Sequence, residues 1–125
     1  MKDIVSTNAP APIGPYSQAI VAGNLLFVSG QVAINPATGD LVMDSIQAET
    51  TQVMENIKAI LTEAGTNFSR IVKTTIFLKD MADFAAVNTV YGSYLSQPFP
   101  ARETVAVAGL PKGVNVEISV TVLLG

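Results

Sequence analysis

Alternation of apolar and polar residues is clearest near the C-terminal end of the chain, over residues 114–124. Aliphatic side chains occupy every second position there, and the residues between them are mostly polar. A period of two is typical of a β-strand with one buried face, because successive side chains point to opposite sides of a sheet. The aliphatic set is Val114, Val116, Ile118, Val120, Val122 and Leu124, and the opposite set includes Asn115, Glu117, Ser119 and Thr121.

Other stretches also have the composition of strands. Residues 16–22 and 25–34 are separated by Gly23-Asn24, which predicts a hairpin with a primed turn because both residues tolerate positive φ. A run rich in β-branched residues predicts a strand over 71–78, and a shorter run predicts one over 103–108. The stretches expected to be irregular or to form turns are 8–15, 35–40 and 110–113.

Apolar residues at spacings of three and four predict a helix over residues 45–64, ended by Gly65. A second helix is predicted over 80–95, with Asn88 inside its apolar stripe. The residues expected to cap or stop these helices are Asp44 or Ser45, Asp80, Pro98 and Pro100.

The predicted elements follow the order ββαβαββ. This order favours a single α+β domain over residues 1–125, with two helices on one face of a mixed β-sheet. The helices can cover only one face. The other face carries Glu117, Ser119 and Thr121, and is expected to be either solvated or buried against another subunit.

Composition adds an expectation of self-association. Of the 125 residues, 49% are apolar and 14% are charged, so the chain is expected to bury more than its own core. The net charge of −3 does not attract a phosphate backbone, so no nucleic-acid partner is expected. No apolar run reaches the ~18 residues of a membrane helix, and residues 1–15 lack the apolar segment of a signal peptide. We therefore expect a cytoplasmic protein with no membrane partner.

The residue types that are missing narrow the possible chemistry. The sequence has no Cys and no His, which excludes thiolate nucleophiles, Ser-His-Asp triads and zinc sites built on those ligands. No carboxylate spacing suits a metal, and no Gly-rich phosphate loop is present. Any catalysis must use carboxylates, hydroxyls, Lys, Arg or backbone N–H groups. The only arginines are Arg70 and Arg102.

Two residues are candidates for chemistry on a small carboxylate. Arg102 could bind a carboxylate through two parallel hydrogen bonds, or it could make an ordinary salt bridge with Glu103 or another acid. Glu117 could be a general acid or base in a cleft where burial tunes its pKa, or a solvated carboxylate on an open sheet. Local sequence leaves these alternatives open. The charges expected to be simply solvated are Lys73, Lys79 and Asp83.

Further residues are candidates for lining a pocket. Tyr16 follows Gly14-Pro15 and could wall a small-ligand pocket or anchor the loop to the core. Ser29-Gly30 interrupts an apolar strand, which indicates a bulge, a close approach of backbone to ligand, or a packing accommodation. Asn88 either contacts a pocket or satisfies neighbouring backbone groups.

A series of short motifs occurs in a fixed order along the chain. They are Ile13-Gly14-Pro15-Tyr16-Ser17-Gln18-Ala19, Val28-Ser29-Gly30-Gln31, Asn35-Pro36-x-Thr38-Gly39, Ile71-Val72-Lys73-Thr74-Thr75, Asp83-Phe84-x-x-Val87-Asn88, Pro100-Ala101-Arg102, Leu110-Pro111-Lys112-Gly113 and Val116-Glu117-Ile118. Together they resemble the RidA family of reactive intermediate deaminases, also called YjgF-like. The resemblance covers essentially the whole chain, and its specificity lies in the combination.

The resemblance implies a chorismate-mutase-like α+β fold, a homotrimer with three clefts between subunits, and no cofactor. It implies hydrolysis of enamine and imine acids, such as 2-aminoacrylate and 2-iminobutanoate, to 2-oxo acids and ammonia. By this resemblance Arg102 binds the substrate carboxylate and Glu117 positions or activates water. The residues that match other cleft positions are Tyr16, Ser29, Gly30, Asn88 and Thr104.

Departures from the family pattern leave the substrate range open. Thr104 stands where many members have Cys, Gly109 where many have Arg, and Ser119 where an acidic residue is common. Three other functions stay open: a non-enzymatic trimer that binds small carboxylates or a partner as a metabolic regulator, an endoribonuclease, and a chaperone acting through exposed apolar surface. The net charge of −3 and the absence of His argue against the endoribonuclease.

Overall fold

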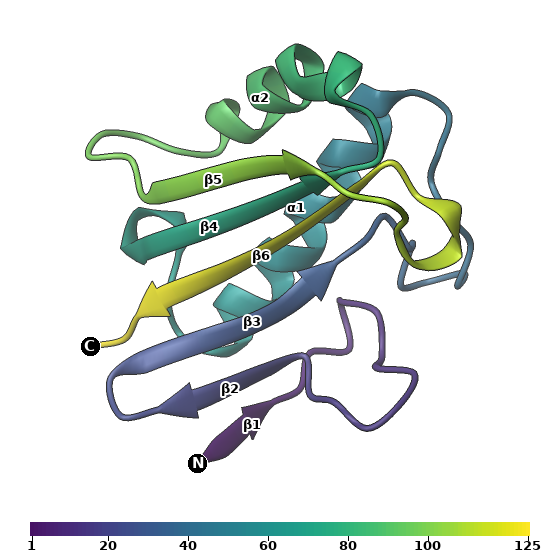
Figure 1. The fold of residues 1–125 in the computed structure, drawn as a ribbon. Helices are drawn as coiled ribbons and strands as arrows, with labels where there is room; N and C mark the ends of the chain where they lie inside the picture. Colours follow the sequence, from purple (N-terminus) through teal and green to yellow (C-terminus); the bar gives the residue numbers. More distant parts are fainter.

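The alternating C-terminal stretch forms a strand, β6, near the centre of a six-stranded sheet in the computed structural model, which describes residues 1–125. The sheet order is β1-β2-β3-β6-β4-β5, and β4 and β5 are parallel whereas every other pair is antiparallel (Figure 1). The strands are β1 (Lys2–Ile4), β2 (Ala19–Ala22), β3 (Leu25–Gln31), β4 (Ile71–Leu78), β5 (Ala101–Ala106) and β6 (Val116–Leu123), and the helices are α1 (Ile46–Glu63) and α2 (Phe84–Ser93).

Both helices belong to the same side of the sheet, as the sequence pattern predicted. The aliphatic positions of β6 from Val116 to Val122 are all buried, and they share one hydrophobic core with α1. The α1 residues in that core recur at helical spacing: Val53, Met54, Ile57, Ile60 and Leu61. Burying such side chains contributes roughly 1.5–3 kcal/mol each, so the apolar stripe of α1 and the apolar face of β6 stabilise each other. No helix is long and apolar enough to cross a membrane.

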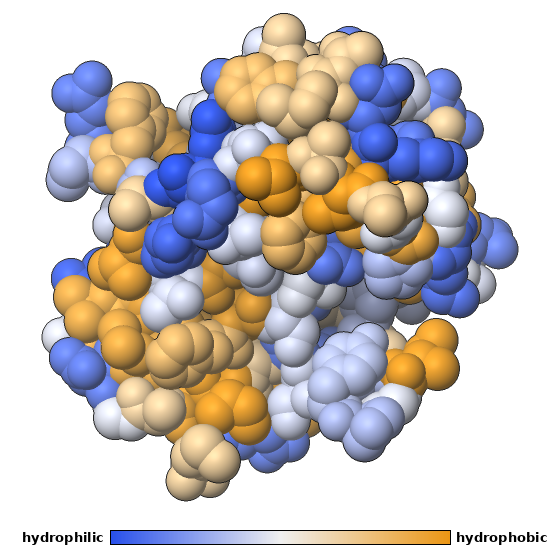
Figure 2. All heavy atoms as spheres, in the orientation of Figure 1, coloured by the Kyte–Doolittle hydropathy of each residue, from blue (hydrophilic) through white to orange (hydrophobic).

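The opposite face of the sheet has no helix over it. Large apolar side chains remain exposed on this face, including Phe27 at 47% and Val105 at 44%. Figure 2 views the molecule from this side and shows extensive hydrophobic surface interrupted by hydrophilic areas. Lys73 and Glu103 pair there at 3.1 Å with both side chains about half exposed, so the predicted solvated charge of Lys73 is also paired. A neighbouring strand already holds the carboxylate that neutralises it.

The helix signals are confirmed for α1 and only in part for α2. Ser45 is the N-cap of α1, accepting a hydrogen bond from the Ala48 N–H at 3.0 Å, and Gly65 follows the helix at φ 77°. Asp80, however, caps the short 3₁₀ turn Met81–Asp83 that precedes α2. The turn takes up the first residues of the predicted helix, and α2 itself ends before the prolines are reached.

The observed strands differ from the predicted ones by one additional edge strand and by the residues at which two strands begin. The observed order is βββαβαββ, because β1 adds an edge strand that the pattern missed. This strand has three residues and buries only Ile4, too few to display a period of two. The second strand begins at Ala19, which leaves Tyr16 in the preceding loop. The strand predicted over 103–108 begins at Ala101, so Arg102 belongs to the strand itself.

A buried carboxylate on α1 fixes the start of β6. Glu49 is fully buried, and its two oxygens accept hydrogen bonds from the backbone N–H of Asn115, the side-chain amide of Asn115 and the backbone N–H of Val116, at 2.8, 2.8 and 3.2 Å. Hydrogen bonds to an ionised acceptor are stronger than neutral ones. Glu49 therefore ties the first turn of α1 to the strand that carries Glu117.

We predict that Glu49→Ala lowers the free energy of unfolding by about 2–4 kcal/mol, because the N–H groups of Asn115 and Val116 lose their buried acceptor. The measurement is urea-induced unfolding at one fixed protein concentration. Glu63→Ala is the matched control on the same helix, since Glu63 is exposed and its side chain makes no hydrogen bond or ion pair, and it should change stability by less than about 0.5 kcal/mol. Equal effects of the two substitutions would remove this role for Glu49.

Candidate functional site

The Ser29-Gly30 interruption of β3 forms a β-bulge beside Glu117. Val28 pairs with Val120 and Gln31 pairs with Ile118, so two residues of β3 lie opposite a single residue of β6. A Cβ atom on Gly30 would lie 2.7 Å from Cδ of Glu117, a distance that real side chains do not tolerate. Gly30 therefore allows the Glu117 carboxyl group to lie directly against the backbone of the bulge.

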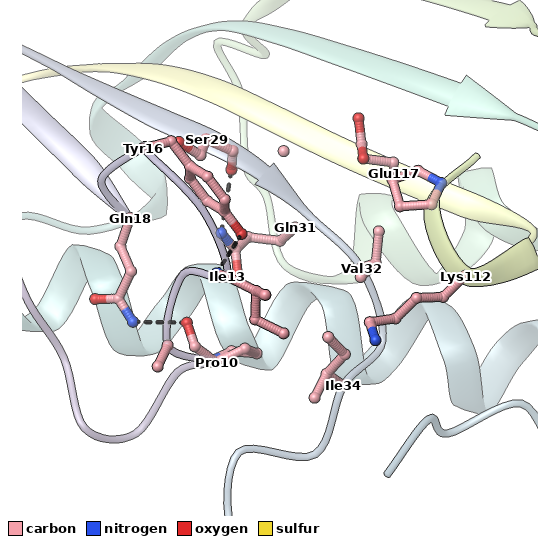
Figure 3. A pocket seen from close by; sticks show the side chains of 13 residues that line it. Pro10, Ile13, Tyr16, Gln18, Ser29, Gln31, Val32, Ile34, Lys112 and Glu117 are labelled. Carbon is pink, nitrogen blue, oxygen red and sulfur yellow. Dashed lines mark hydrogen bonds between the residues drawn. The ribbon is translucent and has the colours of Figure 1, made fainter. Parts of the chain in front are cut away.

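A cavity of about 480 Å³ opens at this bulge (Figure 3). Tyr16, Ser29, Gly30 and Glu117 all line it, so the structure brings together four of the predicted site residues. The Ser29 hydroxyl donates to the carbonyl of Ser17 at 2.6 Å, which fixes the Tyr16 loop to β3. Tyr16 is 52% exposed, and it walls the cavity instead of anchoring the loop in the core.

Glu117 carries the only carboxyl group among the residues that line this cavity. It lies on the face of the sheet without helices, half-buried between neighbouring strands, and no hydrogen bond or ion pair stabilises its charge. Burial raises the pKa of the Glu117 carboxyl above its ordinary value, because the charged form loses solvation. This half-buried environment differs from the open solvated position that the pattern alone permitted.

Arg102 lies in a second cavity of about 310 Å³, beside α2. Its Nη1 donates to Oδ1 of Asn88 at 2.5 Å, and its Cζ lies 5.3 Å from the ring centroid of Tyr91. The salt bridge to Glu103 that we considered is absent, because Glu103 pairs with Lys73 on the other face. Asn88 likewise bonds this side chain and not the neighbouring backbone.

Thr104 lies outside both cavities. It follows Arg102 by two residues on β5 and so points to the same face of the sheet. Its Oγ1 is buried without a hydrogen-bond partner. Many members of the resembled family have Cys at this position. The Thr104 hydroxyl that stands there in this sequence is buried and makes no hydrogen bond within the single chain.

The two candidate catalytic residues are on opposite faces of the sheet. Arg102 pairs in register with Thr74, which is buried toward the helices, and Glu117 pairs with Phe77 on the uncovered face. Cross-strand partners share a face, so the two side chains diverge. Within one chain, the predicted site is thus divided into a Glu117 half and an Arg102 half.

Sequence reasoning missed the aromatic residues around Arg102. In the sequence, Phe84 and Tyr91 fall within the apolar stripe of the helix predicted over 80–95, which indicates core packing. Tyr91 does reach the core, but both rings also contact the guanidinium. Their spacing from Asn88, four and three residues, places all three on one helix face and is the signal that could have revealed this. No group of three or more His, Cys, Asp or Glu side chains is placed to hold a metal ion.

Comparison with known proteins supports one family throughout. A family model described as Endoribonuclease L-PSP matches residues 6–124. Reactive Intermediate Deaminase A of Arabidopsis thaliana is 49% identical over 118 residues, which are 94% of this chain and 63% of that protein.

Solved structures show the same fold. RidA from an Antarctic Psychrobacter species superposes with a TM-score of 0.95 at 43% identity, over 99% of this chain and 100% of the other. TdcF of E. coli, solved with bound serine, has a TM-score of 0.94 at 37% identity and full coverage of both chains. These matches confirm the predicted chorismate-mutase-like α+β architecture, and the chain belongs to the RidA/YjgF family, whose model carries the description Endoribonuclease L-PSP.

Proposed function

We propose that this protein hydrolyses reactive 2-imino and enamine acids, such as 2-iminobutanoate and 2-aminoacrylate, to 2-oxo acids and ammonia. The observation that carries the proposal is the state of Arg102: a guanidinium in a cavity, held by neutral groups, with no acid paired to it. Such a group is ready to bind an anionic ligand. The 49% identity to a protein named Reactive Intermediate Deaminase A supports the reaction class.

The substrate carboxylate gives Arg102 its role. A 2-imino acid carries its carboxylate next to C2, the electrophilic carbon of the C=N bond. A bidentate Arg102 would fix that carbon relative to the protein, and fixed positioning can supply much of a rate enhancement. The backbone N–H of Thr104 would complete the carboxylate site, a role that is independent of the residue's side chain.

Glu117 would act on the attacking water. Water adds to C2 of the protonated imine, its oxygen forms a bond to C2, and the C=N electron pair moves to nitrogen. Glu117 accepts the proton released by the water and returns it to the amino nitrogen. As the C–N bond breaks, the C2 hydroxyl becomes the C=O group, and its proton passes through Glu117 to the departing ammonia, which leaves as ammonium. The protein supplies orientation and proton transfer. The substrate supplies the reactivity, so neither a covalent nucleophile nor a metal has a step to perform.

We further propose that the site is completed by self-association into a homotrimer. Arg102 and Glu117 diverge within one chain, so both can reach one small molecule only if they come from different copies. The uncovered sheet face, with Phe27 and Val105 exposed, is the surface such an assembly would bury. Each cleft would then combine the Arg102 half of one copy with the Glu117 half of its neighbour.

Binding without turnover is the second candidate function. The structure of the relative TdcF with bound serine favours it, because that ligand has a carboxylate and no imine. A binding-only protein would take up 2-oxobutanoate through Arg102 and leave the imine lifetime unchanged. The family description also names an endoribonuclease. With a net charge of −3 and no His, the chain offers little to bind or cleave RNA, and RNA incubated with the protein should stay intact.

Replacing Arg102 tests the carboxylate site. Threonine dehydratase generates 2-iminobutanoate, and the formation of 2-oxobutanoate is followed with and without the protein. Wild type should accelerate it, Arg102→Ala should lose at least about 100-fold of that acceleration, and Arg102→Lys should recover only a part because it lacks the planar fork. Arg70→Ala is the matched control and should behave as wild type. Full activity of Arg102→Ala with unchanged assembly would end the proposed reaction mechanism.

Mixing two inactive variants tests whether the site is shared between copies. Arg102→Ala and Glu117→Gln are unfolded together in equal amounts and refolded. In a random mixture, about a quarter of the clefts would take both intact residues from different copies, so about a quarter of wild-type activity should return. Each variant refolded alone should stay inactive. If the two residues acted from one chain, the mixture would remain inactive as well.

The raised pKa of Glu117 predicts the acid limb of the pH profile. Glu117 accepts a proton only as a carboxylate, so kcat/KM should fall as the pH decreases through its pKa, and this limb should lie above the ordinary glutamate value of 4.5. Glu117→Gln should lose the limb and most of the rate but still bind 2-oxobutanoate. The uncatalysed reaction measured at each pH corrects for protonation of the imine itself. A limb that persists in Glu117→Gln would assign it to another group.

A further inference from the structure

The hydrogen bond and the two aromatic contacts of the Arg102 guanidinium all come from one face of α2. Phe84, Asn88 and Tyr91 are spaced by four and three residues, so their side chains line one side of the helix. The guanidinium carbon lies 5.7 Å from the ring centroid of Phe84 and 5.3 Å from that of Tyr91, both within the range of a cation–π interaction. Asn88, between the rings in sequence, accepts the one hydrogen bond that the guanidinium makes.

These contacts hold Arg102 without neutralising it. Ring faces interact with the guanidinium through the π-system and leave its N–H donors free. Asn88 Oδ1 accepts from one of the five donors, and four remain for a ligand. Burial raises the pKa of the Tyr91 phenol and outweighs the opposite influences of the Thr74 hydrogen bond and of Arg102, so the ring beside the cation carries no charge at neutral pH.

Tyr91, one of the two rings beside Arg102, is itself anchored to the sheet. The Tyr91 hydroxyl donates to Oγ1 of Thr74 at 2.9 Å, and both residues are buried. Thr74 pairs in register with Arg102 across β4 and β5. The cation and the ring that supports it are therefore fixed to adjacent strands, which restricts a side chain that otherwise has about 2 kcal/mol of rotamer entropy to lose on binding.

We propose that Phe84, Asn88 and Tyr91 are positioning residues that hold the Arg102 guanidinium in its ligand-binding orientation before the ligand arrives. This inference rests on the proposed function, because it assigns the ordered cation to carboxylate binding. Preordering matters here since the ligand is small. A carboxylate that had to order the arginine first would lose much of its limited binding free energy.

The test uses three readouts on the intact protein: the guanidinium NMR signals of Arg102, the affinity for 2-oxobutanoate by calorimetry, and imine turnover. With only two arginines, Arg70→Lys leaves Arg102 as the sole source of guanidinium signals. In wild type, these signals should show the ring-current shift of a side chain stacked on aromatic rings.

Asn88→Asp is the sharpest variant. It keeps an acceptor oxygen at the same place and adds a negative charge that competes with the ligand for Arg102. Asn88 is exposed, so the variant should fold normally. The Kd for 2-oxobutanoate should rise by about tenfold or more, with the aromatic stacking shift kept. Thr89→Ala, a change at the next exposed residue of α2, should leave the Kd and the NMR shift as in wild type.

Phe84→Leu and Phe84→Tyr test whether Arg102 needs an aromatic ring at position 84 or only an apolar side chain that fills the space. The leucine variant should lose part of the ring-current shift and weaken 2-oxobutanoate binding by about 2- to 5-fold, whereas tyrosine should restore both. An unchanged Kd in both Asn88→Asp and Phe84→Leu, together with an unchanged ring-current shift in Phe84→Leu, would overturn the positioning role. If shifts and Kd values change as expected but wild type does not accelerate imine hydrolysis, the proposed reaction fails while the positioning of Arg102 stands.

Discussion

The pairing register of β4, β5 and β6 fixes the face of the sheet on which every candidate site residue lies. A slip of one residue in any of these strands would turn Arg102 away from α2 or Glu117 into the core. Burial of the aliphatic face of β6 opposes such a slip, and the Glu49 carboxylate holds the residues at the start of that strand. The division of the site into two halves is therefore a consequence of how the core is packed.

The two halves of the candidate site have opposite electrostatic environments. Arg102 is surrounded by aromatic rings and an amide, so no protein carboxylate competes with an anionic ligand for its guanidinium. Glu117 loses solvation and gains no compensating partner, so its charged form is disfavoured and its proton affinity rises. Direct contact between the two groups within one chain would instead pair the Arg102 charge and lower the pKa of the Glu117 carboxyl.

Period and spacing in the sequence predicted the regular elements well where a long run has one buried face, as in α1 and β6. They failed for β1, whose three residues contain no periodicity, and for the first turn of α2, where Asp80 caps a 3₁₀ turn. For the site, the bulge at Ser29-Gly30 was predictable because Gly is rare in strands. The setting of Arg102 was missed, because Asn88 and its aromatic neighbours are distant in sequence from Arg102, and their spacing also fits an ordinary helix stripe.

Glu103 illustrates why sequence neighbours mislead in strands. It follows Arg102 directly and was the obvious partner for it, yet alternation sends the two side chains to opposite faces. On its own face Glu103 accepts from Thr75 and pairs with Lys73, contacts that hold its pKa below the usual value. Because β5 directs Glu103 to the opposite face, this neighbouring acid cannot neutralise Arg102. An acid capable of doing so would have to come from the α2 face, where this sequence places an amide, Asn88.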